Sequence, residues 1–324
     1  MNRFRLLHVT EFTYDGPVSE SYNQVRLRPI HDERQSCLSF RLSTTPHTHH
    51  TSHKDYFGSW VHSFNVLPEH RRLRVEAESV VLMHELPVPD STMTLEEYES
   101  RKESVEDEYF DFLIPTPFVP PLDALMEIIG EAEASDSVSA LGFLRAASDV
   151  VHQRFRYEKG ATHVHSSIED SLSTRAGVCQ DFAHILLGVA RMRGFAARYV
   201  SGYLVQSPAL EPGASVEEVI GGQASHAWVE VYVPDSGWLA FDPTLGAPVS
   251  TRHVRIAYGR DYGDVAPVRG VYKGHAGQRL SVDVRMRPAL DDEGHELLLE
   301  TAAGPTEAPD PEAPQHQQHQ QQQQ

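Results

Sequence analysis

The sequence predicts an α+β protein with an antiparallel β-sandwich over residues 1–85 and a core over residues 122–300. Two observations support this fold class. Short runs with a period of two recur through the first part, with turn-forming residues between them. In the second part, a helical run over residues 182–192 is apolar nearly all round, and strand-like runs follow it. A helix of that kind is buried, so we expect it to pack on an antiparallel sheet.

The alternation of the first part begins near the N-terminus, where the apolar side chains from Phe4 to Tyr14 fall on one face. This is typical of a half-buried strand. The same pattern recurs over residues 24–28, 38–42, 60–67 and 73–83. Turns such as Asp15-Gly16-Pro17 separate the runs, and this spacing indicates a sandwich.

Residues 86–121 are acidic and contain six prolines, so we interpret them as an inter-domain linker with one short helix around Leu95–Arg101. Ser137 or Ser139 can then cap a helix whose apolar positions recur at helical spacing. Further strands are expected over residues 253–257, 278–287 and 296–301. The last segment, residues 301–324, is rich in proline and glutamine, and we expect disorder there.

Composition limits the classes of function. The net charge of −18 and the absence of a basic stripe argue against a nucleic-acid partner. No apolar window is long enough to span a membrane, and the N-terminus has no apolar leader, so we expect a cytoplasmic protein. The two cysteines, Cys37 and Cys179, lie in different parts, which agrees with a reducing compartment. The oligomeric state stays open.

Cys179 is the central candidate. It follows a turn of small residues and begins the apolar helix, where unpaired N–H groups and the helix dipole favour a thiolate. The alternative is that Cys179 is simply packed, since cysteine is among the most often buried residues. Asp181 lies in the same first turn, and we expect it to cap the helix.

Two strands downstream supply partners for a thiol. His226 begins one strand, Asp242 ends the next, and the connection between them contains Gly237. An even four-residue loop would put the His and the Asp on opposite faces of the sheet. We therefore predict an odd loop or a bulge at Gly237. Thiol attack on a carbonyl needs a thiolate, a proton-shuttling imidazole and a group that orients the imidazole.

The motifs around these residues are Gly177-Val178-Cys179-Gln180-Asp181, Ser225-His226-Ala227-Trp228 and Phe241-Asp242-Pro243-Thr244. In this order they resemble the core of bacterial transglutaminase-like cysteine enzymes. The segments Asn23–Pro29, Asp55–Trp60 and Ala257–Pro267 resemble regions that accompany that core, although Ser59 stands where the family often has Asn.

The resemblance implies a papain-like fold with Cys179 as nucleophile, His226 as base and then acid, and Asp242 as the orienting group. It implies attack on an amide of a peptide or protein substrate through an acyl-thioester, followed by transfer to water or to an amine. Hydrolysis is the expected outcome. The oxyanion would be bound by the backbone N–H of Cys179 and by a second donor in residues 157–165. A non-catalytic peptide-binding module is the alternative.

Other residues are given structural roles, and we expect neither a metal nor a cofactor. The histidines at positions 47, 49, 50 and 53 look like a polar loop, because a metal site would want a Cys or carboxylate at defined spacing. His163 and His165 lie in a loop before Cys179, either in solvent or lining the cleft. His184 and Cys37 are predicted to be packed. Trp228 and Trp238 either line the acyl site or pack in the core.

Overall fold

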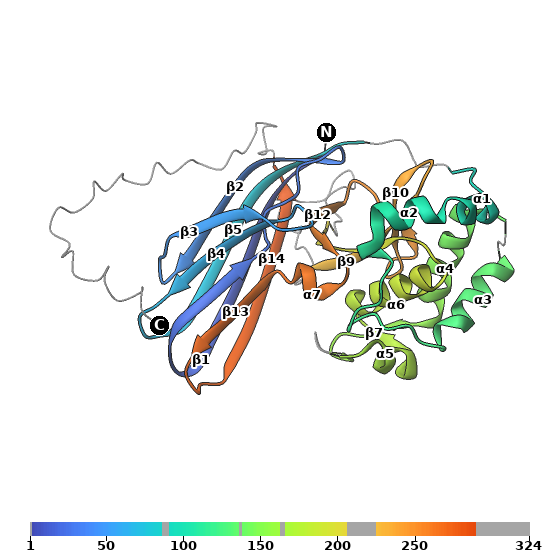
Figure 1. Ribbon diagram of the computed structural model, residues 1–324. Coiled ribbons are helices and arrows are strands. Elements are labelled where there is room, and N and C mark those ends of the chain that lie inside the picture. The colour runs from blue at the N-terminus through green and yellow to red at the C-terminus, as the bar shows by residue number, and fades with distance from the viewer. Residues whose placement is uncertain (1, 86–90, 136–137, 163–165, 206–224, 290–324) are drawn as a thin grey trace, which may run out of the picture.

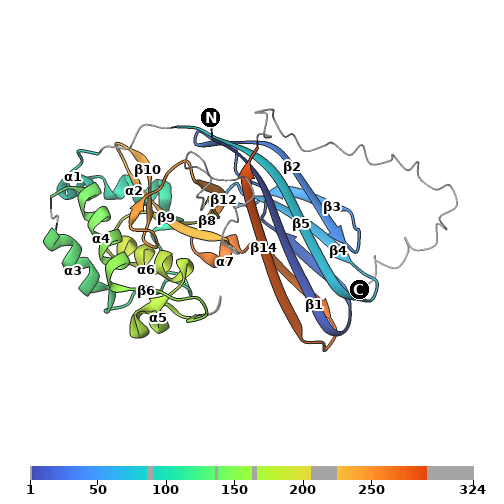
Figure 2. The ribbon, with the colours of Figure 1, turned by 180° about the vertical axis from the view of Figure 1, so that it is seen from behind.

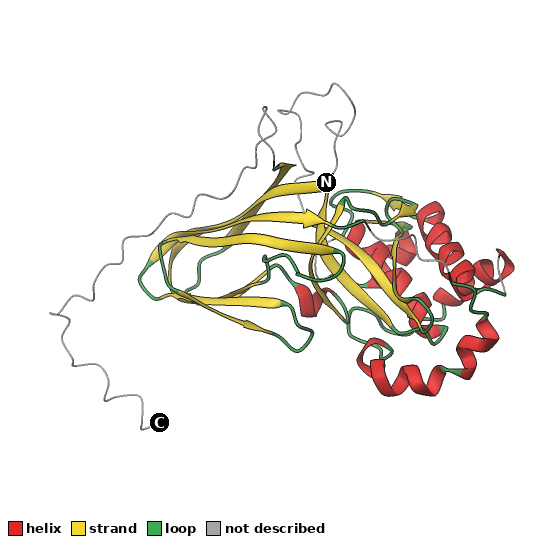
Figure 3. Ribbon diagram, turned by 90° about the horizontal axis from the view of Figure 1, so that it is seen from above, coloured by secondary structure: helices red, strands yellow, loops and turns green. Residues whose placement is uncertain are grey.

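The computed structural model describes residues 2–85, 91–135, 138–162, 166–205 and 225–289. Strands of the N-terminal part occupy one end of the molecule and helices the other, with a second sheet between them (Figures 1 and 3). The loop at 206–224, the strand expected at 296–301 and the tail at 301–324 lie outside the described residues. Within the described part, no helix is long and apolar enough to cross a membrane.

The N-terminal part is an antiparallel sheet folded on itself through one long strand, β1 (Asn2–Val25). Residues 2–13 of β1 pair with β5 (His70–Met83), which in turn pairs with β2 (Gln35–Thr45). Residues 21–25 of β1 pair instead with β4 (Trp60–Val66). Apolar side chains from both layers, including Leu42, Phe64 and Val75, form one buried cluster. The predicted antiparallel sandwich is confirmed, although β1 is longer than expected and the predicted polar loop around residue 50 forms a strand, β3 (His50–Lys54).

Two C-terminal strands complete this sheet, so their assignment to the core at 122–300 was wrong. Strand β14 (Gln278–Pro288) pairs with β1 over residues 4–14, and β13 (Val268–Lys273) pairs with it nearer Val25. Figure 1 shows these late strands beside the first one. The backbone groups of an edge strand need a pairing partner. The local pattern of residues 278–287 predicts a strand but does not say which strand it pairs with.

The acidic segment after β5 belongs to the core rather than to a linker. It forms α1 (Leu95–Ser100), α2 (Lys102–Tyr109) and a short 3₁₀ turn, Phe110–Phe112. Leu95, Tyr98 and Val105 are buried with the helices of the second part. The short helix around residue 95 was predicted. The buried face was missed because acids dominate the exposed positions.

The remaining helices surround α6 (Cys179–Met192), whose residues from Gln180 to Arg191 are all buried. They are α3 (Leu125–Ser135), α4 (Ala140–Arg154), α5 (Ile168–Thr174) and α7 (Tyr262–Val265). Ser139 caps α4 by accepting a hydrogen bond from the Gly142 N–H, as predicted. Two short strands, β6 (Arg156–Tyr157) and β7 (Ala176–Gly177), run parallel just before α6. The predicted central buried helix is confirmed.

A second antiparallel sheet lies against α6, with strand order β11-β10-β9-β8-β12 (Figure 2). Its strands are β8 (Ala197–Leu204), β9 (His226–Val233), β10 (Gly237–Asp242), β11 (Ala247–Pro248) and β12 (His253–Gly259). Alternate residues of β9, including Val229 and Val231, pack with α6 in the main core. His226, Trp228 and Glu230 alternate with them and therefore face the opposite side.

The β9–β10 hairpin has a register that places His226 and Asp242 on one face of the sheet. Gly237 pairs with Val233, which leaves the odd loop 234–236, and Gly237 has a φ of +71°. Residues of equal parity therefore share a face, which places His226 and Asp242 together. The predicted odd loop with Gly237 in the left-handed region is confirmed.

The two parts share an apolar interface. Phe4 and Leu6 of β1 and Met286 of β14 are buried in one cluster with Tyr203 of β8 and Ile256 of β12. The hydroxyl of Tyr203 lies 2.6 Å from His8 Nδ1. Strand β14 therefore contributes to the sheet and to the contact with the core.

We expect Met286→Ala to lower the free energy of unfolding by about 2–5 kcal/mol, because it removes a core side chain and leaves a cavity. Met286 is 1% exposed, whereas Leu280 on the same strand is 54% exposed. The matched control Leu280→Ala should change stability by no more than about 0.5 kcal/mol. Urea denaturation measures both values. Equal effects would contradict a buried β14.

Candidate active site

The thiol of Cys179 lies at the first residue of α6, directly after the N-cap Val178. Asp181 holds this turn, since its Oδ2 accepts the Val178 N–H at 2.7 Å and the Thr162 hydroxyl at 2.5 Å. A Cβ at Gly177 would lie 2.6 Å from the same carboxylate oxygen, so the turn has no room for a side chain there. The predicted capping role of Asp181 is confirmed. At a helix start, the N–H of Cys179 has no intrahelical acceptor.

His226 is the side chain that the structure brings to this thiol. The Sγ of Cys179 lies 4.0 Å from the carbonyl oxygen of Ser225, the residue before His226, and the thiol is close enough to raise the pKa of His226. The Nε2 of His226 lies 2.7 Å from Asp242 Oδ2. Since Nε2 is engaged by the carboxylate, Nδ1 is the nitrogen available to Cys179. The three residues predicted from the motifs are therefore close together, in the order thiol, imidazole, carboxylate.

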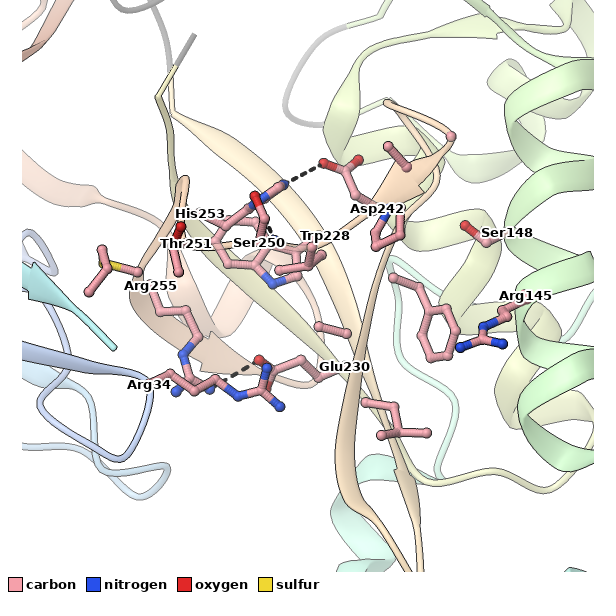
Figure 4. Close-up of a pocket in the computed structure, with 18 of the residues that line it drawn as sticks. Arg34, Arg145, Ser148, Trp228, Glu230, Asp242, Ser250, Thr251, His253 and Arg255 are labelled. Atoms are coloured by element: carbon pink, nitrogen blue, oxygen red, sulfur yellow. Dashed lines mark hydrogen bonds and ion pairs between the residues drawn. The ribbon is translucent and has the colours of Figure 1, made fainter. Parts of the chain in front are cut away.

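A second histidine, His253, contacts the same carboxylate and was not singled out from the sequence. Its Nε2 lies 3.1 Å from Asp242 Oδ2, and its Nδ1 accepts the Ser250 N–H at 3.1 Å (Figure 4). Because Nδ1 is an acceptor, Nε2 carries the proton and donates to Asp242. His253 lies on β12, which is separated from β10 by two strands of the sheet. Only the strong curl of that sheet brings the two side chains together.

The carboxylate of Asp242 is saturated with donors. Its Oδ1 accepts the backbone N–H groups of Thr244 at 2.9 Å and Leu245 at 3.2 Å, and its Oδ2 faces the two imidazoles. The side chain is 0% exposed. Burial alone would raise the pKa of Asp242, but the hydrogen bonds from His226 and His253 hold it below its usual range. Asp242 is therefore an anion despite its burial.

The same contacts stabilise the protonated form of His226. Burial alone would lower the pKa of His226, but hydrogen bonds with Asp242 and Cys179, and the negative charges of both groups, raise it to about 10. An imidazolium next to a thiol favours the thiolate. The geometry thus supports a protonated His226 beside the Cys179 thiol at neutral pH.

The Trp228 ring packs against the rings of both His226 and His253. Its ring centroid lies 5.3 Å from that of His253 and 6.1 Å from that of His226. A Cβ at Gly202 on β8 would lie 2.5 Å from the Trp228 ring, so only glycine fits there. Trp238 instead packs among Tyr109 and other aromatic rings away from the thiol. Of the two tryptophans considered, Trp228 is the one beside the site.

His226, Asp242 and His253 are also spaced as metal ligands, with their candidate ligand atoms all within 4.8 Å of one another. A metal ion could bind His253 Nε2 only through a free lone pair on that nitrogen. Because His253 Nδ1 accepts the Ser250 N–H, Nε2 carries the proton and has no free lone pair. The donor pattern therefore fits a hydrogen-bonded network better than a metal centre.

The other residues considered from the sequence have packing roles where they are described. His184 accepts the Tyr262 N–H at 3.2 Å, and burial lowers its pKa to about 3. Cys37 donates to the Ser39 carbonyl, and burial raises the pKa of its thiol. His50 and His53 lie on the exposed strand β3. His163 and His165 lie outside the described residues.

The buried helix with a thiol at its start, packed on a curled antiparallel sheet that carries His and Asp, defines a papain-like fold. A model of the bacterial transglutaminase-like N-terminal region matches residues 4–82, and one of the transglutaminase-like superfamily matches residues 131–243. An uncharacterized protein of Mycobacterium leprae is 34% identical over 88% of this chain and 99% of its own. The chain belongs to the transglutaminase-like superfamily and carries that N-terminal region.

One further relative and one solved structure are informative. A protein-glutamine gamma-glutamyltransferase of Pseudomonas aeruginosa is 33% identical over 127 residues, which is 39% of this chain and 18% of that protein. The crystal structure of a candidate cysteine protease from Cytophaga hutchinsonii has a TM-score of 0.65, with 88% of this chain and 90% of that chain covered. At 20% identity, this second likeness shows the fold alone.

The interaction of Cys179 with His226 predicts the pH at which the His226 imidazole loses its proton. The folded-state pKa of His226, about 10, is above the ordinary 6.5, so its protonation stabilises the fold fully below that ordinary value. This contribution is lost as the pH rises from 6.5 towards about 10. NMR of the imidazole Cε1–H, assigned with His226→Gln, should give a midpoint near 10, and Cys179→Ala should lower it clearly. An unchanged midpoint in Cys179→Ala would contradict the coupling, and Cys37→Ala is the control.

Proposed function

We propose that the protein is a cysteine-dependent amide hydrolase or acyltransferase that acts on peptide or protein amides through an acyl-thioester on Cys179. The observation that carries this proposal is the His226–Asp242 pair, 2.7 Å apart, beside the Cys179 thiol, whose Sγ lies 4.0 Å from the carbonyl oxygen of Ser225. Family membership supports the same chemistry. The positions of the three groups support these roles.

The reaction would proceed in two stages. The Cys179 thiolate attacks the amide carbonyl carbon, the tetrahedral intermediate collapses, and His226 gives its Nδ1 proton to the leaving amine. The acyl group is then held as a thioester on Cys179. His226 next takes a proton from water or from an acceptor amine, which attacks the thioester carbonyl and restores the Cys179 thiolate. Asp242 holds the His226 ring in the required orientation throughout.

Two donors are available for the oxyanion that forms in each stage. The Cys179 N–H is one, because it begins α6. We assign Tyr157 as the second donor. Its backbone pairs with Gly177, two residues before the thiol, and its ring centroid lies 6.5 Å from that of Phe182 in the first turn of α6. Burial and the negative charge of Cys179 raise the pKa of Tyr157, so the phenol stays protonated and can donate a hydrogen bond to the oxyanion.

His253 has a positioning role in this scheme. It donates to the oxygen of Asp242 that also faces His226, and its own orientation is set by Ser250. Loss of this donor would remove one of the four hydrogen bonds that fix the buried carboxylate beside His226. The alternative function is a peptide-binding module without turnover, in which the groove is retained and the thiol is idle.

Trapping the acyl-enzyme tests the proposed function. After acid quenching of a reaction with a mixture of casein peptides, we expect an acyl adduct on the Cys179 peptide by mass spectrometry. Cys179→Ala should lose the adduct and reduce turnover at least about a thousandfold, since the nucleophile is removed. Cys37→Ala is the matched control and should retain both. Adding a dansylated primary amine distinguishes transfer from hydrolysis by the product formed.

No adduct, together with peptide binding that survives in Cys179→Ala, would favour the binding module. Turnover retained in Cys179→Ala would refute the proposed nucleophile.

Substitution of His253 tests its positioning role. His253→Phe removes one hydrogen bond to a charged group, worth about 1.5–3 kcal/mol, so kcat should fall about tenfold or more with KM nearly unchanged. His253→Gln keeps an N–H donor and should recover most of kcat. Steady-state kinetics with a peptide identified by the trap measures both variants. An equal loss in both variants would show that the ring matters only for packing.

A further inference from the structure

Strand β12, which carries His253, lies at one end of the second sheet. Among the described residues it pairs with one strand, β8, so the backbone groups along its other side need partners from elsewhere. Two turns of the N-terminal part supply them. One is at residues 32–35 and ends at the first residue of β2, and the other is at residues 55–59.

The first turn supplies a side chain that takes the place of a neighbouring strand. Through Oε1, Gln35 accepts the Arg255 N–H at 2.8 Å, and through Nε2 it donates to the Arg255 carbonyl at 2.8 Å. The Ile30 N–H donates to the same carbonyl at 3.1 Å. Gln35 is 0% exposed. One buried carboxamide therefore makes both of the hydrogen bonds that a paired strand residue would make with Arg255.

The same turn holds the side chain of Arg255. Asp32 Oδ2 accepts a hydrogen bond from Arg255 Nη2, while its Oδ1 accepts the Gln35 N–H at 3.2 Å. Asp32 thus fixes the turn and the guanidinium together. The other amino group of this guanidinium, Nη1, donates to Glu230 on β9 at 3.0 Å (Figure 4). Arg255 therefore links the N-terminal turn to the strand on which His226 lies.

The second turn reaches β12 beyond the bulge that follows Arg255. The hydroxyl of Ser59, which is 1% exposed, accepts the Tyr258 N–H at 3.4 Å. Asp55 holds this turn, since its Oδ1 accepts the Ser59 N–H at 2.9 Å and its Oδ2 pairs with Arg26 at 3.0 Å. The side chains that cover β12 thus come from two separate segments of the N-terminal part.

The covered side of β12 is next to the candidate active site. His253 and Arg255 are two residues apart and project from the same face, and His253 Nε2 lies 3.1 Å from Asp242 Oδ2 (Figure 4). Gly202 on β8 pairs with Arg255 on one side and with His226 on the other. A shift of β12 at Arg255 would therefore displace His253 and disturb the row of paired residues that contains His226.

We propose that Gln35 and Asp32 are positioning residues, through which the N-terminal part holds β12 where His253 can donate to Asp242. The kinetic consequence of this role rests on the function proposed above. Its structural consequence, the hydrogen bond from His253 to Asp242, can be measured without turnover. The N-terminal region is then part of the catalytic unit, because it completes the sheet that carries the site.

The variant Gln35→Met tests this role, because it keeps the length of the side chain and removes the hydrogen bonds of the carboxamide. The first readout is the Nε2–H proton of His253 in ¹H–¹⁵N spectra, assigned by its loss in His253→Phe. We expect this resonance to move upfield or to be lost through exchange with water, because the hydrogen bond to Asp242 weakens. With the peptide identified by the acyl-enzyme trap, kcat should fall about tenfold with KM nearly unchanged.

Two further variants separate positioning from stability. Val75→Ala removes a buried side chain of the N-terminal sandwich, in a different apolar cluster from that of β12. It should lower the urea midpoint and leave the His253 proton and kcat unchanged. Asp32→Asn keeps the Oδ1 acceptor of the turn and removes the charge opposite Arg255. It should change the His253 proton and kcat in the same direction as Gln35→Met, with a fall in kcat of about threefold.

An unchanged His253 proton in folded Gln35→Met would overturn the positioning role, whatever happens to kcat. Equal changes in Val75→Ala would overturn it as well, since they would follow from lower stability alone. If Gln35→Met does not fold, Asp32→Asn decides by the same two criteria. A shifted proton in a protein that shows no turnover as wild type would support the role of the N-terminal part and refute the proposed function instead.

Discussion

The negative charge of Asp242 is the constraint on which the site depends. A carboxylate that is 0% exposed stays ionised only if donors surround it, and here two imidazoles and two backbone N–H groups do so. The backbone donors come from the turn after β10, which Pro243 begins. The imidazoles come from β9 and β12, at separate places in the sheet. The curl of the sheet is therefore as necessary to the site as the residues themselves.

Much of the site could be predicted from the sequence because its signals are local. Cys179 begins an apolar helix after a turn of small residues, and Asp181 in the same turn indicates a cap. Gly237 indicates a left-handed position in the hairpin, and the parity of the odd loop then places His226 beside Asp242. Each of these inferences uses residues within one helix or one hairpin.

The parts that could not be predicted depend on contacts between distant segments. His253 opens an ordinary strand, and only the curvature of the sheet takes its ring to Asp242. The same is true of β14, whose alternation indicates a strand but not that its neighbour is β1. The many acidic residues of α1 and α2 suggested a solvated linker, although Leu95 and Tyr98 of this segment are buried in the main apolar cluster. Periodicity identifies an element, whereas its partner is decided by shape and by the burial available elsewhere.

The pairing of β14 with β1 has a consequence for biosynthesis. During translation, the first strand leaves the ribosome about 250 residues before its partner does. The segment that contains α6 and the second sheet is complete by then and can collapse around its own apolar cluster. One edge of β1 stays open through that interval, and an open edge is a place where strands of other chains can add. Pairing with β14 covers this edge and places β1 in the middle of a sheet.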